Sequence, residues 1–252
     1  MVFPNELQPS YYFRLENALY TSLFVGVSTV WESLHRLNDF VRQRIGTLED
    51  KVVKEHGVYI HPTAVLSGPI LVRADAVIGP HVVIEGPVVI DRAVTILAHA
   101  YIGPNTYVGE RTEIRPGAFI RGDVYIGSRC QVRGEVKHSV FMDDVHMPHY
   151  SYAGDSIVGM RCNLAAGSIL SNSKNDKSPV RTNVRGQVYD TGLAKMGAIL
   201  GDDVKLGCNV VTNPGTLIGM DTLVYGLASI RGFVPTRSIV KYSPSFEIVP
   251  KR

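Results

Sequence analysis

Five residues in the middle of the chain are of types that together could transfer a group to an amine: Arg115, Glu135, Lys137, His149 and Tyr152. An amine attacks only after its ammonium form loses a proton, and histidine titrates near neutral pH, so His149 is a candidate general base. Glu135 could accept the other N–H of that imidazole. Arg and Lys bind phosphate through charge-assisted hydrogen bonds, and we expect Arg115 and Lys137 to converge on one anion. The residues predict a base beside an anion site.

Other histidines could bind a metal ion instead, because imidazole is a frequent zinc ligand. His146 and His149 have the spacing of two ligands, but no third ligand follows at a convincing spacing. His81 and His99 lie 18 residues apart, which predicts that they stack on one outer face, yet the rest of a zinc signature is missing. The three cysteines form no metal pattern and are expected to be reduced wall residues. We therefore predict no metal.

A repeat of six residues must position these side chains. An aliphatic residue occupies every sixth position from Ile60 to Val132, and the period returns at Val158 and again at Leu200. Six residues fit one short strand and one corner, so three hexads close a coil of 18 residues with the aliphatic anchors inside. Glycine follows many anchors, where we expect turns that need a positive φ. The pattern predicts an all-β chain that forms a parallel β-helix.

The segment before the repeat is predicted to be helical from about Phe13 to Lys54, because apolar residues recur every three or four positions. The apolar stretch Leu19 to Trp31 is too short and too polar for a membrane span, and no secretory signal is evident. We expect a helical cap over the open end of the solenoid, with a partner-docking arm as the alternative. The predicted divisions are a helical segment at 1–57, the β-helix at 58–242 and a tail at 243–252.

Composition limits the function classes. The chain of 252 residues has a formal net charge of +3 and no long run of basic residues, which argues against nucleic-acid binding and leaves anionic small molecules. We expect a cytoplasmic protein without membrane contact.

The repeat fails in two places, and chemistry is expected there because a regular wall mainly supplies stability. Between Val132 and Val158 the anchors slip by two residues and polar positions increase. After Leu170 the hexads stop in a polar excursion, at about residues 171–198. Loops of this length are usually functional or mobile.

The first break carries a specific resemblance. The run MPHYSYAGDSIVGMRCNLAAGSILSN, together with the upstream IRPGAF and GEVKHS, resembles the glucosamine-1-phosphate N-acetyltransferase domain of bifunctional bacterial and archaeal sugar nucleotidyltransferases. The excursion is similar to archaeal members, and the similarity covers about residues 95–242. These are hexapeptide-repeat transferases, so the resemblance implies a left-handed β-helix and a homotrimer.

The resemblance also implies a role for each matching residue. His149 would be the general base and Glu135 its orienting partner. The other implied sugar contacts would bind the phosphate, the ring or the amine, and they are Arg115, Lys137, Tyr152, Asn163, Asn172 and Lys177. Acetyl-CoA would be the co-substrate, and its implied contacts are Ala166, Cys208, Tyr225 and Lys241.

Two departures from the family keep other functions open. Ala165 replaces a family glycine, and its Cβ could crowd a close backbone approach. The nucleotidyltransferase half is absent from residues 1–57, which contain no Gly-rich phosphate loop. The expected activity is acetyl transfer to an amino-sugar 1-phosphate. The alternatives are a non-catalytic sugar-phosphate-binding or oligomerisation solenoid, and an acyltransferase that acts on a UDP-amino sugar.

Overall fold

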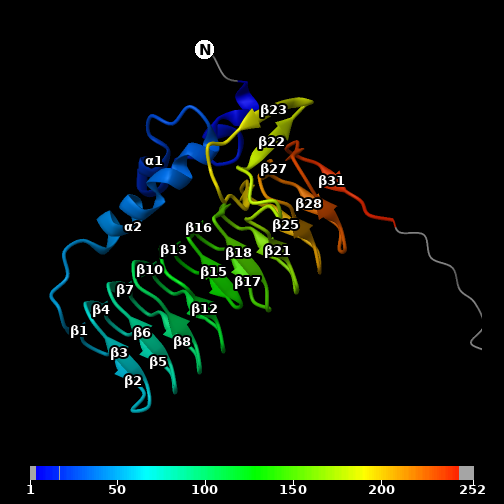
Figure 1. Ribbon diagram of the computed structural model, residues 1–252. Helices are drawn as coiled ribbons and strands as arrows, with labels where there is room; N and C mark the ends of the chain where they lie inside the picture. Colours follow the sequence, from blue (N-terminus) through cyan, green and yellow to red (C-terminus); the bar gives the residue numbers. More distant parts are fainter. Residues whose placement is uncertain (1–3, 17, 244–252) are drawn as a thin grey trace, which may run out of the picture.

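The computed structural model describes residues 4–16 and 18–243, and most of these residues form a long solenoid of short strands (Figure 1). Three parallel sheets run along it, and each coil contributes one strand to each sheet. A parallel β-helix of hexapeptide repeats is therefore confirmed. The C-terminal tail expected at 243–252 lies outside the described residues, apart from Ser243.

The strands follow the order of the coils along each sheet. Sheet A contains β1 (Val52–Lys54), β4 (Ile70–Val72), β7 (Val88–Ile90), β10 (Thr106–Val108), β13 (Val124–Ile126), β16 (Ser139–Phe141), β19 (Ile157–Val158), β24 (Ala198–Leu200), β27 (Thr216–Ile218) and β30 (Phe233–Val234). Sheet B contains β2 (Tyr59–Ile60), β5 (Val77–Ile78), β8 (Thr95–Ile96), β11 (Glu113–Ile114), β14 (Gln131–Val132), β17 (His146–Met147), β20 (Asn163–Leu164), β25 (Lys205–Leu206), β28 (Leu223–Val224) and β31 (Ile239–Val240). Sheet C contains β3 (Val65–Ser67), β6 (Val83–Glu85), β9 (Tyr101–Ile102), β12 (Phe119–Ile120), β15 (Glu135–Lys137), β18 (Tyr152–Gly154), β21 (Ile169–Leu170), β26 (Val211–Thr212) and β29 (Ser229–Ile230).

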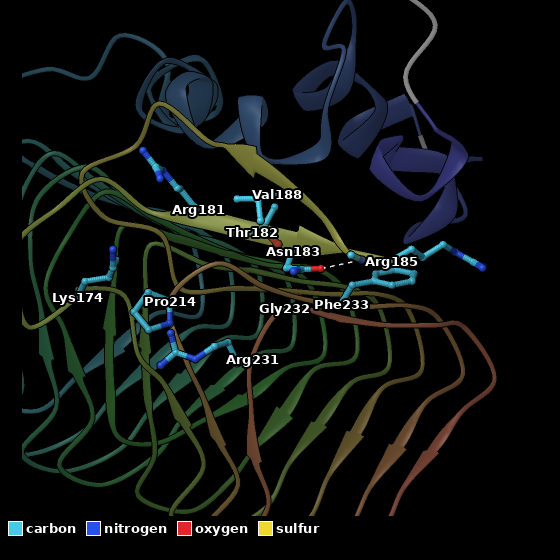
Figure 2. A pocket seen from close by; sticks show the side chains of 11 residues that line it. Lys174, Arg181, Thr182, Asn183, Arg185, Val188, Pro214, Arg231, Gly232 and Phe233 are labelled. Carbon is cyan, nitrogen blue, oxygen red and sulfur yellow. Dashed lines mark hydrogen bonds between the residues drawn. The ribbon is translucent and has the colours of Figure 1, made fainter.

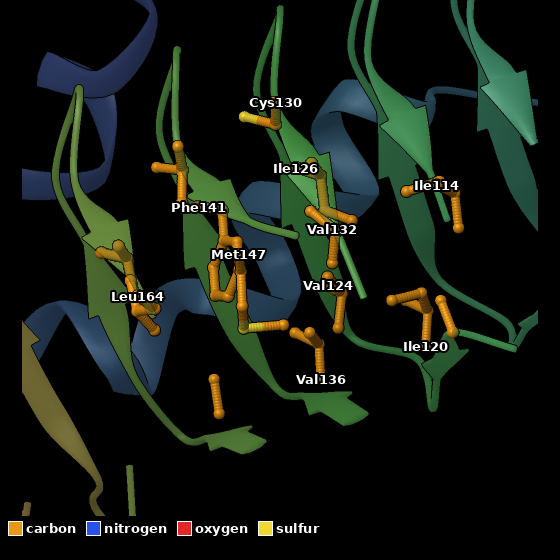
Figure 3. Packing of buried hydrophobic residues seen from close by; sticks show 14 of the residues in the cluster. Ile114, Ile120, Val124, Ile126, Cys130, Val132, Val136, Phe141, Met147 and Leu164 are labelled. Carbon is orange, nitrogen blue, oxygen red and sulfur yellow. The ribbon is translucent and has the colours of Figure 1, made fainter. Parts of the chain in front are cut away.

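The repeated aliphatic residues fill the interior of the solenoid. The anchors Ile78, Ile96 and Ile114 are fully buried and lie in register on successive strands of sheet B. Figure 3 shows the same inward stacking in the middle coils, where Ile126, Val132 and other buried side chains point into the core. Burying one such side chain contributes about 1.5–3 kcal/mol, so the ladder of anchors is the main source of stability.

The glycines that follow the anchors have a different cause from the one expected. Gly103 and Gly109 do not adopt a positive φ, and the left-handed corner residues are mostly non-glycine, such as Asp75 and His99. A Cβ on Gly103 would lie 2.7 Å from the Arg121 carbonyl oxygen on the next coil. These glycines are needed because successive coils approach closely at the corners.

The N-terminal segment is helical but broken into short pieces. These are the 3₁₀ helices η1 (Asn5–Leu7), η2 (Pro9–Tyr11) and η3 (Val30–Arg36), and the α-helices α1 (Ala18–Phe24) and α2 (Leu37–Ile45). Gly26 and Gly46 have positive φ, where one continuous helix cannot form. No helix within the described ranges is long and apolar enough to cross a membrane.

These helices lie along the flank of sheet A rather than across the open end of the solenoid (Figure 1). Phe40 of α2 packs edge-to-face on Tyr125 of β13, with ring centroids 5.2 Å apart. The outward-facing residues of sheet A, such as Val89 and Ile157, are apolar and buried beneath the N-terminal segment. The flank requires a cover because of this apolar outer column, which accounts for the difference from the expected cap.

The excursion folds back on the same flank. Its strands β22 (Arg181–Val184) and β23 (Gln187–Asp190) form an antiparallel hairpin. Tyr189 contacts Trp31 with ring centroids 6.3 Å apart, and Arg185 pairs with Glu6 at 2.6 Å. The hairpin and the N-terminal segment thus form one cover over sheet A.

Candidate functional site

Shortened coils re-align the residues of the first break. Regular coils pair residues 18 apart, as with Glu113 and Gln131, whereas Gln131 pairs with His146 fifteen residues on. Phe119 pairs with Glu135, and Glu135 pairs with Tyr152. This re-alignment decides which side chains stack at the edge where sheet C turns toward sheet A, which we call the C–A corner.

A buried carboxylate lies at the centre of the C–A corner. Asp155 is 6% exposed, and its Oδ1 lies 2.9 Å from Nδ1 of His138. Lys137 Nζ lies 3.5 Å from its other oxygen, to which the Asn172 side-chain amide also donates a hydrogen bond. Burial acts to raise the pKa of Asp155, but the hydrogen bonds from His138 and Asn172 and the charge of Lys137 outweigh it and hold the pKa below its ordinary value. Asp155 is therefore an ionised anchor for three side chains.

Tyr152 extends this cluster along sheet C. Its hydroxyl donates to Oδ1 of Asn172 over 3.2 Å. Burial, followed by the charges of Glu135 and Asp155, raises the pKa of Tyr152. The structure thus brings together three of the predicted sugar contacts, Lys137, Tyr152 and Asn172.

Glu135 pairs with Arg121 in the same cluster. Nη1 of Arg121 donates to Oε1 of Glu135 over 2.8 Å, and the Arg121 backbone N–H donates to the Val136 carbonyl on the next coil. This pairing differs from the expected contact between Glu135 and His149. Arg121 was missed by sequence reasoning, because counting in steps of 18 conceals a coil that is two residues short.

Arg115 lies at the opposite end of sheet C from Lys137. Its Nε donates to Glu113 over 2.8 Å, and its Nη1 lies 3.4 Å from the Pro148 carbonyl, at the corner between sheets B and C. Within one chain, Arg115 and Lys137 therefore do not converge on one anion as expected. The irregular register causes this, because Lys137 pairs across the C–A corner instead.

His149 lies at the same B–C corner and is exposed. The neighbouring Tyr150 is 60% exposed, and the guanidinium of Arg133 lies over its ring at 4.2 Å from the centroid. The histidine that does have a carboxylate partner is His138, which sequence reasoning missed. Its position directly after the Glu-x-Lys element and the shortened coil were the signals that could have identified it.

The predicted acyl-donor contacts lie mainly around a hollow of about 540 Å³ on the outer face of sheet B. Cys208 and Tyr225 line it, together with Asn163, Ala165 and Tyr242. Asn163 therefore belongs to this hollow and lies apart from Asn172. Lys241 is exposed and precedes Tyr242, while the carbonyl of Ala166 accepts a hydrogen bond from Asn209 N–H.

Lys177 lies in the excursion, away from the other predicted sugar contacts of its own chain. It is exposed and adopts a positive φ of 59° in the turn before the hairpin. The residues that the structure describes contain no group of three or more His, Cys, Asp or Glu side chains placed to hold a metal ion. His81 and His99 do stack, with ring centroids 5.1 Å apart.

The sequence of this region matches known proteins. Residues 102–223 match the family described as the GMPPB C-terminal domain. Over 118 residues the chain is 36% identical to the bifunctional protein GlmU of Methanococcus maripaludis strain C7. Part of this β-helix is homologous to GlmU. That match covers 47% of this chain and 28% of the relative, so the chain spans about a quarter of the length of the GlmU proteins it matches.

Other relatives and solved structures agree on the type of chain. A bifunctional sugar-1-phosphate nucleotidylyltransferase/acetyltransferase of Sulfurisphaera tokodaii is 40% identical over 91 residues, which cover 36% of this chain and 23% of that protein. A crystal structure of a UDP-N-acetylglucosamine acyltransferase overlays with a TM-score of 0.38 and 19% identity, and covers 74% of this chain and 70% of that chain. At these values the likeness carries no statement about activity.

Proposed function

We propose that this chain is an acyltransferase that moves an acetyl group from acetyl-CoA to the amine of an amino-sugar 1-phosphate, with glucosamine-1-phosphate as the first candidate. The observation that carries the proposal is the cluster around Asp155. A solenoid that served only as a scaffold would not need a buried ionised carboxylate that holds His138, Lys137 and Asn172 at one corner. Similarity of the same segment to GlmU supports the reaction class.

The cations of the cluster would bind the sugar phosphate. Lys137 lies beside Asp155, and Arg121 stacks one coil away on Glu135, so two positive groups flank the corner. Phosphate binding by such groups also orients the sugar. Tyr152 and Asn172 would hold the ring through the hydroxyl and amide that now bond to each other. Arg115 and Lys177 stay predicted contacts, and they lie where a neighbouring protomer would present them.

His149 would act as the general base. Its imidazole is exposed at the B–C corner, where a substrate can reach it. The ammonium of the sugar must lose a proton before its nitrogen can attack the thioester carbon, and the neutral imidazole accepts that proton. The thiol of CoA then leaves as the tetrahedral intermediate collapses. Backbone N–H groups near the carbonyl would stabilise its oxyanion, each by roughly 3–4 kcal/mol.

The hollow on sheet B would bind the acyl donor. Its lining combines apolar surface from Leu223 and Tyr225 with the cation of Lys205, which suits a ligand with a long chain and phosphate groups. Ala165 lines the same hollow, and the methyl group is tolerated if the donor passes beside it. We further propose that the active form is a homotrimer in which sheets B and C face neighbouring protomers, since sheet A is covered by the chain's own helices.

The proposal is tested by incubating the full chain with acetyl-CoA and glucosamine-1-phosphate and measuring both CoA release and the N-acetylated sugar phosphate. Turnover that depends on the phosphate supports the proposal. Absence of acetylation with every amino-sugar phosphate tried would favour the scaffold or binding role instead.

A further inference from the structure

A basic groove continues the C–A corner beyond the Asp155 cluster. It consists of two adjoining hollows of about 430 and 560 Å³, which share Lys174, Pro214 and Arg231. The smaller hollow begins at Ser171, next to Asn172. The larger hollow lies between the excursion hairpin and the last coils, where Figure 2 shows Thr182 and Val188 of the hairpin facing Pro214 and Arg231.

The charge of the groove is strongly positive. Four cationic residues line the larger hollow, and none of the described residues in that lining is acidic: Lys174, Arg181, Arg185 and Arg231. Arg185 pairs with Glu6 at 2.6 Å and Arg181 lies 3.6 Å from Asp190, so these two charges are partly balanced.

The partners of the other two cations leave charge for a ligand. Nη2 of Arg231 donates to the neutral amide oxygen of Asn213 over 3.2 Å. Lys174 donates to the Ser178 hydroxyl and lies 3.6 Å from Asp176, a carboxylate that is 65% exposed. Lys174 and Arg231, which both hollows share, are therefore available to an anion.

One end of the groove also offers apolar surface for a flat ring. Phe233 lines the larger hollow and is partly buried against Tyr11, with ring centroids 5.7 Å apart. Val188 of the hairpin is 52% exposed and lines the same hollow. An aromatic ring and a β-branched side chain around a cationic pocket match a ligand that is planar at one end and anionic next to it.

The register of sheet C connects this groove with the Asp155 cluster. Leu170, Thr212 and Ile230 pair on successive coils, so Ser171, Asn213 and Arg231 follow them in one column. Adjacent strands lie about 4.8 Å apart, which puts the coil of Arg231 about 10 Å from that of Ser171. The groove is thus elongated and begins beside the residues assigned to the sugar.

We propose that this groove binds a nucleoside diphosphate group, with its phosphates on Lys174 and Arg231 and its base between Phe233 and Val188. The inference deepens the proposed function and rests on it for the assignment of the sugar end. Two substrates carry this group: a nucleotide-activated amino sugar as acceptor, or the acyl donor through its adenosine diphosphate moiety.

The test is isothermal titration of the full chain with UDP and with ADP. We expect saturable binding at roughly millimolar concentration or below. Arg231→Ala and Lys174→Ala should each weaken it about tenfold or more, as loss of a charge-assisted hydrogen bond does. The matched control is Arg92→Ala, which removes an exposed arginine several coils away. Melting temperatures check that each variant is folded.

Preference for UDP would identify the acceptor as the source of the group, and preference for ADP would identify the donor. No binding of either nucleotide, or binding that Arg231→Ala leaves unchanged, would overturn the inference. The acetylation assay separates this result from the proposed function. Transfer to glucosamine-1-phosphate without nucleotide binding rejects only the groove, and nucleotide binding without any transfer rejects only the activity.

Discussion

Two histidines of the first break differ in what surrounds them. His138 is held by the buried carboxylate of Asp155 at 2.9 Å, whereas His149 is exposed at the other end of sheet C. A residue tied to an ionised carboxylate inside its own chain is suited to positioning. A residue that faces open space at a corner is suited to meeting a substrate. This contrast supports His149 as the base and His138 as part of the scaffold of the phosphate site.

We predict that His149→Gln lowers kcat for acetyl transfer by about 10²–10⁴, the usual effect of losing a general base, and leaves the melting temperature unchanged. His146→Gln is the matched control, because His146 is also exposed and lies three residues earlier. Both rates are measured by CoA release. Full activity in His149→Gln would move the role to His138, and His138→Gln would then be the inactive variant.

Lys137 carries a second prediction at this scale. Lys137→Met should lower kcat/KM for glucosamine-1-phosphate by roughly 10- to 100-fold, because one charge-assisted contact is worth about 1.5–3 kcal/mol. Activity toward free glucosamine, which has no phosphate, should change little. Lys54→Met is the control, since Lys54 is exposed on the first strand of sheet A. An equal loss for both sugars would show that Lys137 acts on structure rather than on the phosphate.

The N-terminal segment is the element that departs most from a regular repeat, and ionic contacts join it to the late coils. Asp203 accepts hydrogen bonds from Arg161 at 2.8 and 2.9 Å and from Arg14 at 2.5 Å. These bonds, first that of Arg161, lower the pKa of Asp203 to about 2, while burial opposes them. Arg14 thereby connects the segment to the coil that follows the excursion.

We predict that Asp203→Asn destabilises the protein at neutral pH by at most about 1 kcal/mol, because the arginines are partly exposed. A carboxyl whose folded-state pKa is lowered stabilises the fold above its ordinary pKa of 3.8 and loses that contribution as pH falls toward about 2. Thermal unfolding of both proteins should therefore converge over this range. A difference that grows on acidification, or one matched by Asp190→Asn in an exposed pair, would contradict the account.

The elements differ in how far sequence could predict them. The anchors specify the coil because a period of six admits one inward position, and Ile60 to Val132 lie as expected. The apolar pattern of the N-terminal segment indicates that one face must be covered, but not which surface covers it. Only the outward column of Val89, Tyr125 and Ile157 explains why the helices lie on sheet A.

The site was less accessible to sequence reasoning for a related reason. Spacing alone paired Arg115 with Lys137 because each coil was counted as about 18 residues. The short coils between Phe119 and Tyr152 instead align Arg121 with Lys137. Residue types suggested a phosphate site, and the pairing of its members required the register.

For the whole molecule, the covered flank limits how copies can associate. The outer faces of sheets B and C remain open and carry exposed aromatic residues, such as Phe119, which is 43% exposed and stacks near Tyr101 at 5.3 Å. We predict that light scattering gives the mass of three chains, and that Phe119→Glu on sheet C yields monomers. Val25→Glu, which changes a residue that is 63% exposed in the N-terminal segment, should leave the trimer intact. A monomeric wild type at micromolar concentration would contradict the trimer.

Acetyl transfer by the wild-type chain tests the central claim most directly. Initial rates are measured with acetyl-CoA and either glucosamine-1-phosphate or free glucosamine at equal concentrations, with formation of the amide followed by mass spectrometry. The account predicts acetylation of the phosphorylated sugar and a much lower rate with glucosamine, since Lys137 and Arg121 meet the phosphate. Equal rates with the two sugars, or no amide from either, would contradict it.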